Sequence, residues 1–242
     1  MKQEIWHGDC LELMKNIPDG SIDCVITDPP YGTTSCKWDA CIPFEPMWEQ
    51  LKRVTKKNGA IVLFGSQPFT SALVMSNVKD FKQLQVWDKC MPVGFLNAKK
   101  KILSRHEDIV VFSPAPFGHF TYNPQMRKGK MRNKTPKRAA DTVEGRAYNT
   151  VTHKGDNFND QYYPTSILEL SNAHQTGKVH PTQKPVALME YLIKTYSNEW
   201  EMILDFTAGS GSTGVAAKNL NRQFILIEKE KEYYDICVER LK

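Results

Sequence analysis

The sequence of 242 residues lacks several features that would define other classes of protein. None of its six cysteines forms a C-x-x-C pair, so we expect reduced thiols, no disulfide framework and no metal site. No run approaches the roughly 18 apolar residues that span a bilayer, and residues 1–9 contain no apolar signal segment. These absences predict a cytoplasmic globular protein that does not contact a membrane.

Charge of either sign is moderate. Lys and Arg number 32 against 27 Asp and Glu, which leaves a net charge of +5. Such a balance is weak evidence for a nucleic-acid partner unless the charge is concentrated in one segment. A hydrophobic fraction of 40% excludes a wholly disordered or collagen-like chain. The length suits one α/β domain or one domain with an insertion.

Short apolar runs alternate with amphipathic segments at both ends of the chain but not in its middle. The expected strands are 22–27, 60–64, 84–87, 201–204 and 223–227, and the expected helices are 43–54, 69–77, 185–195, 211–220 and 230–241. Between the two ends, only 107–112 is typical of a strand. The pattern predicts a domain made of residues 1–91 and 179–242, with an irregular, basic insertion at 92–178.

A glycine-rich turn follows an apolar run at residues 202–214, which read M-I-L-D-F-T-A-G-S-G-S-T-G. Glycines allow a tight turn and a close approach of backbone to ligand. Glu228 stands 19 residues after Gly209, at the end of the next expected strand, where a carboxylate can accept ribose hydroxyls. The spacing G-x-G-x-x-G is also typical of a site that binds a nicotinamide dinucleotide. Asp205 disfavours it, because a carboxylate at the strand end repels a diphosphate and suits an amino or cationic group.

A second motif, D-P-P-Y at residues 28–31, follows the apolar run 22–27 directly. Asp28 is therefore expected at the carboxyl end of a strand, where ligands bind in open α/β sheets. Pro29 and Pro30 stiffen the loop and remove two N–H donors, while their carbonyl groups remain acceptors. With Tyr31 beside them, these acceptors suit a planar ring that carries an amino group.

Taken in order, the motifs resemble those of the β class of amino-methylating DNA methyltransferases. The segments that carry the resemblance are G-D-C-L-E-L at 8–13, D-P-P-Y at 28–31, H-P-T-Q-K-P at 180–185 and D-F-T-A-G-S-G at 205–211, with Thr207 and Ala208 as small variations. In this class the D-P-P-Y box precedes the variable region and the glycine box follows it. The resemblance implies a Rossmann-like, S-adenosylmethionine-dependent methyltransferase sheet that is circularly permuted, with an inserted target-recognition region.

The resemblance also implies a site for S-adenosylmethionine. Asp205 would meet the ammonium group of its methionine end, Glu228 the ribose hydroxyls, and Lys184 the carboxylate. Asp9 and the backbone of Cys10 would lie near the adenine ring. The full set of implied cofactor residues is Asp9, Cys10, His180, Thr182, Lys184, Asp205, Phe206, Gly209, Gly211 and Glu228.

The implied reaction moves a methyl group from a sulfonium to an exocyclic amine, which requires in-line alignment but no metal or covalent intermediate. Asp28 and the carbonyl of Pro29 would accept hydrogen bonds from the amine and stabilise the charge that develops on it. Tyr31 would stack on a base flipped out of the duplex. The expected catalytic residues are therefore Asp28, Pro29, Pro30 and Tyr31.

Seven basic residues and no acid lie in the run 127–138, which is typical of contact with backbone phosphates. The short segment 32–39 follows the D-P-P-Y box and could close over the site. The candidate DNA-binding residues are Lys37, Trp38, Arg127, Lys128, Lys130, Arg132, Lys134, Lys137 and Arg138.

Several alternatives stay open at this point. Cytosine-N4 enzymes more often carry S-P-P-Y, so Asp28 favours adenine-N6. RNA and protein-glutamine methyltransferases more usually carry N-P-P-Y and lack a basic insertion in this place. Intact Asp28, Tyr31, Asp205 and Glu228 disfavour an inactive DNA-binding relative. The resemblance implies double-stranded DNA as partner, and a homodimer or a cognate restriction endonuclease is left undecided.

Overall fold

The computed structural model describes residues 2–32, 40–134, 157–172 and 183–242. The chain forms two compact units, one made of Met1–Asn123 and Thr165–Lys242 and the other of Pro124–Pro164.

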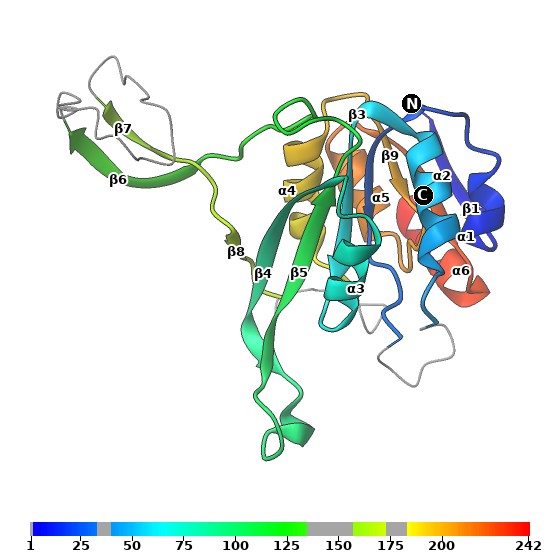
Figure 1. Ribbon diagram of the computed structural model, residues 1–242, viewed down its shortest axis with the longest axis horizontal. Coiled ribbons are helices and arrows are strands. Elements are labelled where there is room, and N and C mark those ends of the chain that lie inside the picture. Colours follow the sequence, from blue (N-terminus) through cyan, green and yellow to red (C-terminus); the bar gives the residue numbers. More distant parts are fainter. Residues whose placement is uncertain (1, 33–39, 135–156, 173–182) are drawn as a thin grey trace. The chain divides into compact units, whose positions relative to one another are not determined.

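An eight-stranded sheet runs through the first unit in the order β1-β10-β9-β2-β3-β5-β4-β8 (Figure 1). Its strands are β1 (Gln3–His7), β2 (Ile22–Thr27), β3 (Thr55–Gly65), β4 (Phe81–Val93), β5 (Ser104–Phe112), β8 (Ile167–Glu169), β9 (Met202–Asp205) and β10 (Gln223–Glu228). All pairs are parallel except those of β5, which runs antiparallel to β3 and β4. Because β9 and β10 lie between β1 and β2, both ends of the chain complete one sheet. The expected permuted, Rossmann-like fold is confirmed.

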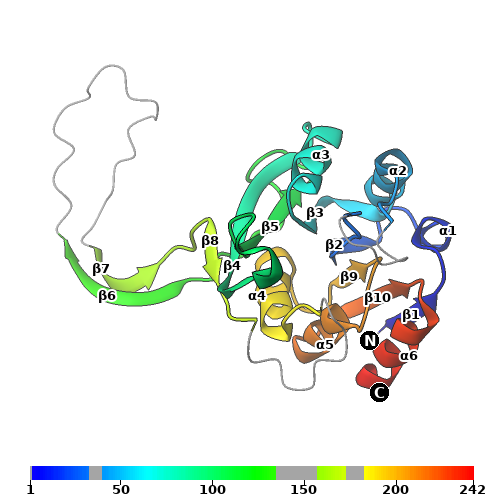
Figure 2. The same cartoon turned by 90° about the horizontal axis from the view of Figure 1, so that it is seen from below.

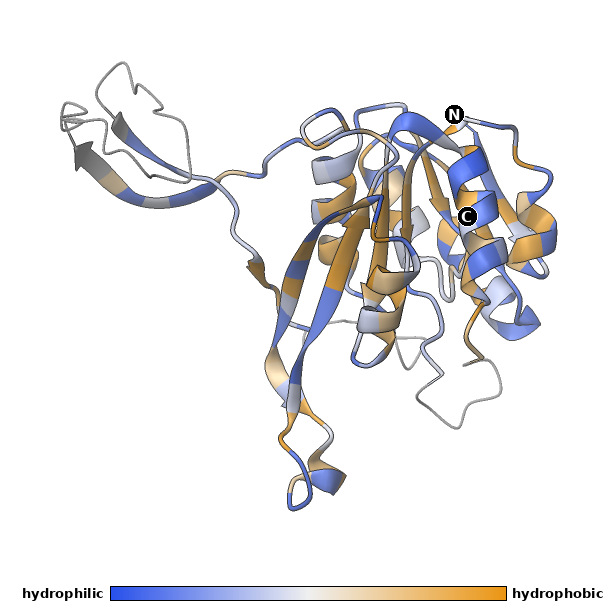
Figure 3. Cartoon of the chain, viewed as in Figure 1, coloured by the Kyte–Doolittle hydropathy of each residue, from blue (hydrophilic) through white to orange (hydrophobic). Residues whose placement is uncertain are grey.

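Helices cover both faces of this sheet (Figure 2). The helices α1 (Cys10–Met14), α2 (Phe44–Val54) and α3 (Phe69–Ser76) pack on one face. The helices α4 (Val186–Tyr196), α5 (Ser212–Asn219) and α6 (Lys231–Leu241) pack on the other. The hydrophobic colour in Figure 3 is accordingly concentrated on the strands and on the helix sides that face them. A central strand such as β2 is buried at every position, as parallel strands between two helical layers are.

None of the helices in the described part of the chain is long and apolar enough to cross a bilayer.

Some element bounds differ from those expected. The helix α2 ends at Val54 and β3 begins at Thr55, five residues before the expected strand. The start of β3 was missed because Lys56, Lys57 and Asn58 interrupt the apolar pattern although they belong to the strand. The strand β4 reaches from Phe81 to Val93 rather than covering only 84–87. The elements β1 and α1 were not expected.

The second unit contains the two-stranded antiparallel sheet of β6 (Arg127–Lys134) and β7 (Asn157–Tyr162). The expectation that residues 92–178 are irregular apart from 107–112 is therefore corrected. Charged and polar residues give β6 and β7 no apolar period, so a pattern of hydrophobicity could not reveal them. The strand β5 belongs to the large sheet, and the compact unit spans 124–164. The assignment of DNA recognition to 92–178 stays a prediction.

Candidate active site

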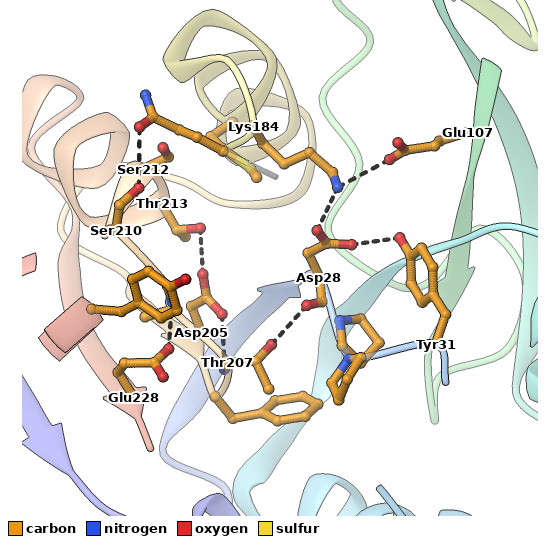
Figure 4. A pocket seen from close by; sticks show the side chains of 18 of the residues that line it. Asp28, Tyr31, Glu107, Lys184, Asp205, Thr207, Ser210, Ser212, Thr213 and Glu228 are labelled. Carbon is orange, nitrogen blue, oxygen red and sulfur yellow. Dashed lines mark hydrogen bonds and ion pairs between the residues drawn. The ribbon is translucent and has the colours of Figure 1, made fainter. Parts of the chain in front are cut away.

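The site lies where two neighbouring strands end. The strands β2 and β9 pair in parallel, with Cys24 beside Ile203 and Val25 beside Leu204. From β9 the chain passes through α5 to β10 on one side, whereas from β2 it passes through α2 to β3 on the other. Such a reversal of strand order opens a crevice at the carboxyl ends of the strands. A cavity of about 730 Å³ occupies this position, and both Asp28 and Asp205 line it (Figure 4).

Asp205 is held by donors from three elements and is only 4% exposed. Its Oδ1 accepts from the hydroxyl of Thr27 at 2.6 Å and from the N–H of Thr207 at 3.1 Å. Its Oδ2 accepts from the hydroxyl of Thr213 at 2.6 Å. Burial nevertheless raises the pKa of Asp205 to about 6, because these donors offset only part of the cost of removing the carboxylate from water.

The glycine turn is joined to the end of β10. The N–H of Gly209 donates to Oε2 of Glu228 at 2.7 Å, and the N–H of Glu230 donates to Oε1 at 2.8 Å. Burial raises the pKa of Glu228. Gly209 has a φ of +52°, and a Cβ added there would meet no described atom within 4 Å. Gly211 has a φ of +79°, and its added Cβ would lie 2.5 Å from Sγ of Cys237. Gly209 therefore borders open space, whereas Gly211 serves close packing.

At the other end of the cavity, Asp28 belongs to a partly buried chain of charges of alternating sign (Figure 4). The hydroxyl of Tyr31 donates to Oδ1 of Asp28 at 2.5 Å, and the ammonium of Lys184 pairs with Oδ2. The same ammonium lies 3.0 Å from Oε2 of Glu107. Oε1 of Glu107 in turn lies 2.5 Å from Nζ of Lys89. Two carboxylates thus share two ammonium groups, and the network carries no net charge.

Burial and neighbouring charge set the proton affinities of this network. Burial raises the pKa of Asp28, with Lys184 opposing and Glu107 adding to the rise. Burial also acts on Glu107, but the ammonium groups of Lys184 and Lys89 outweigh it and hold the pKa of Glu107 below its ordinary value. The two carboxylates raise the pKa of Lys184 in spite of its burial, so this side chain stays charged.

The structure brings most of the expected site residues to one cavity. Those that line it are Asp9, Cys10, Asp28, Pro29, Pro30, Tyr31, Lys184, Asp205, Phe206, Gly209 and Glu228. The candidates Lys37, Trp38, Lys137, Arg138, His180 and Thr182 lie outside the described residues. Arg127, Lys128, Lys130, Arg132 and Lys134 belong to β6 in the second unit.

The ammonium of Lys184 is paired with Asp28 and Glu107, which the sequence did not indicate. The role expected of Lys184 at the carboxylate of a cofactor stays a prediction. Sequence reasoning also missed Thr27, Glu107 and Lys89. For Thr27 a signal existed, since it ends the strand that leads into the D-P-P-Y box. Glu107 likewise stands just before an apolar run.

Comparisons with known proteins agree with this geometry. A family model described as DNA methylase (N6_N4_Mtase) matches residues 22–239. The chain belongs to this family of DNA methylases.

Two curated relatives and two solved structures illustrate the likeness. Type II methyltransferase M.HpaI of Haemophilus parainfluenzae is 31% identical over 258 residues, which cover 100% of this chain and 74% of the relative. For M.BglII of Bacillus subtilis the identity is 30%, with 98% and 68% covered. The M1.HpyAVI–SAM complex is 27% identical with a TM-score of 0.63 and covers 98% of this chain and 99% of its own. The cytosine-N4-specific PvuII DNA methyltransferase has a TM-score of 0.70 at 16% identity, with 100% and 87% covered, and shows the fold alone.

The buried carboxylate of Asp205 predicts a pH dependence of stability. The native state keeps Asp205 protonated up to about pH 6, whereas the unfolded chain loses the proton near the ordinary pKa of 3.8. The native state therefore binds more protons between these values, and the free energy of unfolding falls as pH rises through them. The fall is about 3 kcal/mol for this group.

We expect Asp205→Asn, which cannot titrate, to lose this contribution. Urea unfolding followed by circular dichroism from pH 4 to pH 7 measures it as the difference between the wild-type and variant curves. Parallel curves would show that the carboxylate is already ionised at pH 4.

Proposed function

We propose that the protein transfers the methyl group of S-adenosylmethionine to the N6 amine of adenine in double-stranded DNA. The observation that carries this proposal is the joining of two binding surfaces in one cavity. One surface is the glycine turn with Asp205 and Glu228, and the other is the loop of Asp28 and Tyr31. A volume of about 730 Å³ suits a nucleoside-sized cofactor together with a base.

The hydrogen-bond acceptors of the cavity fit S-adenosylmethionine. Asp205 accepts three hydrogen bonds, and a carboxylate has room for a fourth, from the ammonium group of the cofactor. Two backbone N–H groups donate to the carboxylate of Glu228. The remaining lone pairs of this carboxylate can accept hydrogen bonds from two ribose hydroxyls. Asp9 and Cys10 border the same cavity and fit the adenine end. Cofactor roles for His180 and Thr182 stay predictions.

The residues around Asp28 suit the transfer step. The cofactor supplies an activated methyl group, so this chain has only to align the amine with it and stabilise the positive charge that develops on nitrogen. Asp28 and the carbonyl of Pro29 are the acceptors for that amine. Lys184 and Tyr31 occupy the Asp28 carboxylate in the structure, so the target amine displaces or joins them. Since Lys184 also contacts Glu107, it can release Asp28 without losing every ion pair.

Adenine is favoured over cytosine because the motif begins with Asp28, whereas the cytosine-N4 enzymes that the motif also resembles more often carry serine at this position. The likeness to the cytosine-N4-specific PvuII enzyme concerns the fold and does not bear on the base. A homodimer and a cognate restriction endonuclease remain predictions from the sequence.

The acceptor role of Asp28 is tested with Asp28→Ala. We expect methyl transfer to be abolished while the affinity for S-adenosylmethionine changes little, because Asp28 binds the target amine rather than the cofactor. Unmethylated DNA is incubated with methyl-labelled cofactor, digested to nucleosides and analysed by mass spectrometry, and calorimetry measures the affinity. The exposed Asp235→Ala serves as control. Near-normal activity of Asp28→Ala would exclude the assignment, and label in N4-methylcytosine would exclude adenine as the target.

The glycine turn offers a matched pair of variants. Gly209 and Gly20 have φ values of +52° and +58°, and an added Cβ meets no described atom within 4 Å at either position. Alanine should therefore cost each about 1–2 kcal/mol of stability through backbone strain alone. Only Gly209 borders the cavity, so Gly209→Ala should also weaken cofactor binding at least tenfold in calorimetry. Equal affinities of the two variants would place the cofactor elsewhere.

The exposed basic residues of β6 predict salt-dependent DNA binding. Arg127, Lys128 and Lys130 are exposed. Replacing all three with Gln should weaken binding and reduce the slope of log affinity against log salt by up to about 0.9 for each phosphate that is no longer neutralised. Fluorescence anisotropy of labelled duplex DNA across a salt series measures both effects. A control carries the same change at three exposed lysines of the first unit: Lys15, Lys57 and Lys79. An unchanged slope would locate the phosphate-binding residues outside β6.

A further inference from the structure

The hairpin of β4 and β5 has an exposed apolar tip. The two strands pair from Phe81 and Phe112 to Asp88 and His106 and, after an irregular stretch, again at Val93 and Ser104. The tip extends away from the helices (Figure 1). Leu96 at the tip is 100% exposed, Ile102 94% and Phe95 65%. In Figure 3 hydrophobic and hydrophilic colours alternate along this hairpin, and both occur at its tip. Large apolar side chains gathered at an exposed tip indicate a surface that is covered when the protein acts.

The charge around this tip favours a polyanion as the partner. No acidic residue lies between Asp88 and Glu107, a stretch that includes the consecutive lysines Lys99, Lys100 and Lys101. All three lysines are exposed. Phosphates of a nucleic-acid backbone complement such a cluster. A second copy of this chain would bring its own lysines to the contact, and like charges would repel.

The base of the same hairpin forms a wall of the candidate active site. Trp87 and Lys89 from β4 and His106 and Glu107 from β5 line the cavity that contains Asp28. Val93 and Ser104, the last paired residues before the tip, line it as well. Leu96 follows Val93 by three residues, which span at most about 10 Å. The tip therefore lies close to the mouth of the cavity.

The hairpin is also anchored to the site. Glu107 on β5 pairs with Lys89 on β4 and with Lys184, which contacts Asp28. Further out, the guanidinium of Arg105 donates to Asp88 at 2.7 Å and holds the two strands together. These ion pairs fix the position of the hairpin relative to the loop that contains Asp28.

We propose that this tip contacts duplex DNA beside the target base, with Phe95 and Leu96 inserted into the base stack and Lys99–Lys101 on the neighbouring phosphates. Proteins that distort DNA insert Phe, Leu, Ile or Met between base steps. A flipped base leaves a gap that such side chains can fill, which offsets part of the few kcal/mol lost on unstacking. The inference rests on the proposed function, because it assumes that a base in duplex DNA is the substrate.

The test compares wild type with Phe95→Ala/Leu96→Ala on two oligonucleotide duplexes. Both carry the site that wild type methylates, as mapped in the product assay. In one the target base is paired, and in the other it faces a mismatch and is already weakly stacked. Single-turnover methylation rates are measured at saturating cofactor. Met75→Ala, a change at an exposed apolar side chain on α3, is the control.

We expect the double variant to be at least tenfold slower on the paired duplex and within twofold of wild type on the mismatched one. Fluorescence of 2-aminopurine at the target position should show a matching loss of flipping. Equal slowing on both duplexes, or no slowing, would overturn the insertion. So would a variant that is monomeric by light scattering where wild type is dimeric, because the tip would then bind a second copy. Absence of DNA methylation by wild type itself would overturn the proposed function instead.

Discussion

The strands β2 and β9 pair in parallel, and residues that are far apart in the chain meet at their carboxyl ends. Thr27 ends β2 and donates its hydroxyl to Asp205 at the end of β9. An isolated buried carboxylate would be strongly disfavoured, and the hydroxyl and N–H donors around Asp205 offset part of that cost at this junction. Because the same pair of strands directs the Asp28 loop and the glycine turn toward one cavity, the site exists only when this pairing forms.

A second constraint links the junction to the β4–β5 hairpin. Ion pairs join four residues of alternating charge, in the order Asp28, Lys184, Glu107 and Lys89. Loss of one partner from a buried pair typically costs about 3–5 kcal/mol, because it leaves the other charge unpaired. The network therefore holds the loop after β2, the segment before α4 and both hairpin strands in one arrangement. It also orients the Asp28 carboxylate at the edge of the cavity, where a substrate amine can reach it.

Elements with a strong local pattern could be predicted from the sequence, and others could not. The strand β2 has the expected bounds because its apolar run stops at Asp28 and two prolines, which cannot continue a central strand. The outer half of β4 was missed, since its exposed residues lack the alternation that burial imposes. The charged strand β6 was missed for the same reason. In both cases pairing with a partner strand, which no local pattern encodes, makes the segment a strand.

The sequence by itself determined the chemistry available to this protein. The sequence shows an acceptor-rich D-P-P-Y loop and a glycine turn followed by a carboxylate. Both motifs consist of residues that are close together in the chain, so they can be recognised without the structure. Only the tertiary structure decided which groups meet. Lys184 lies between Asp28 and Glu107, and Lys89 joins them from β4. The physical reason is that distances between such remote residues follow from strand order and register, which are properties of the whole sheet.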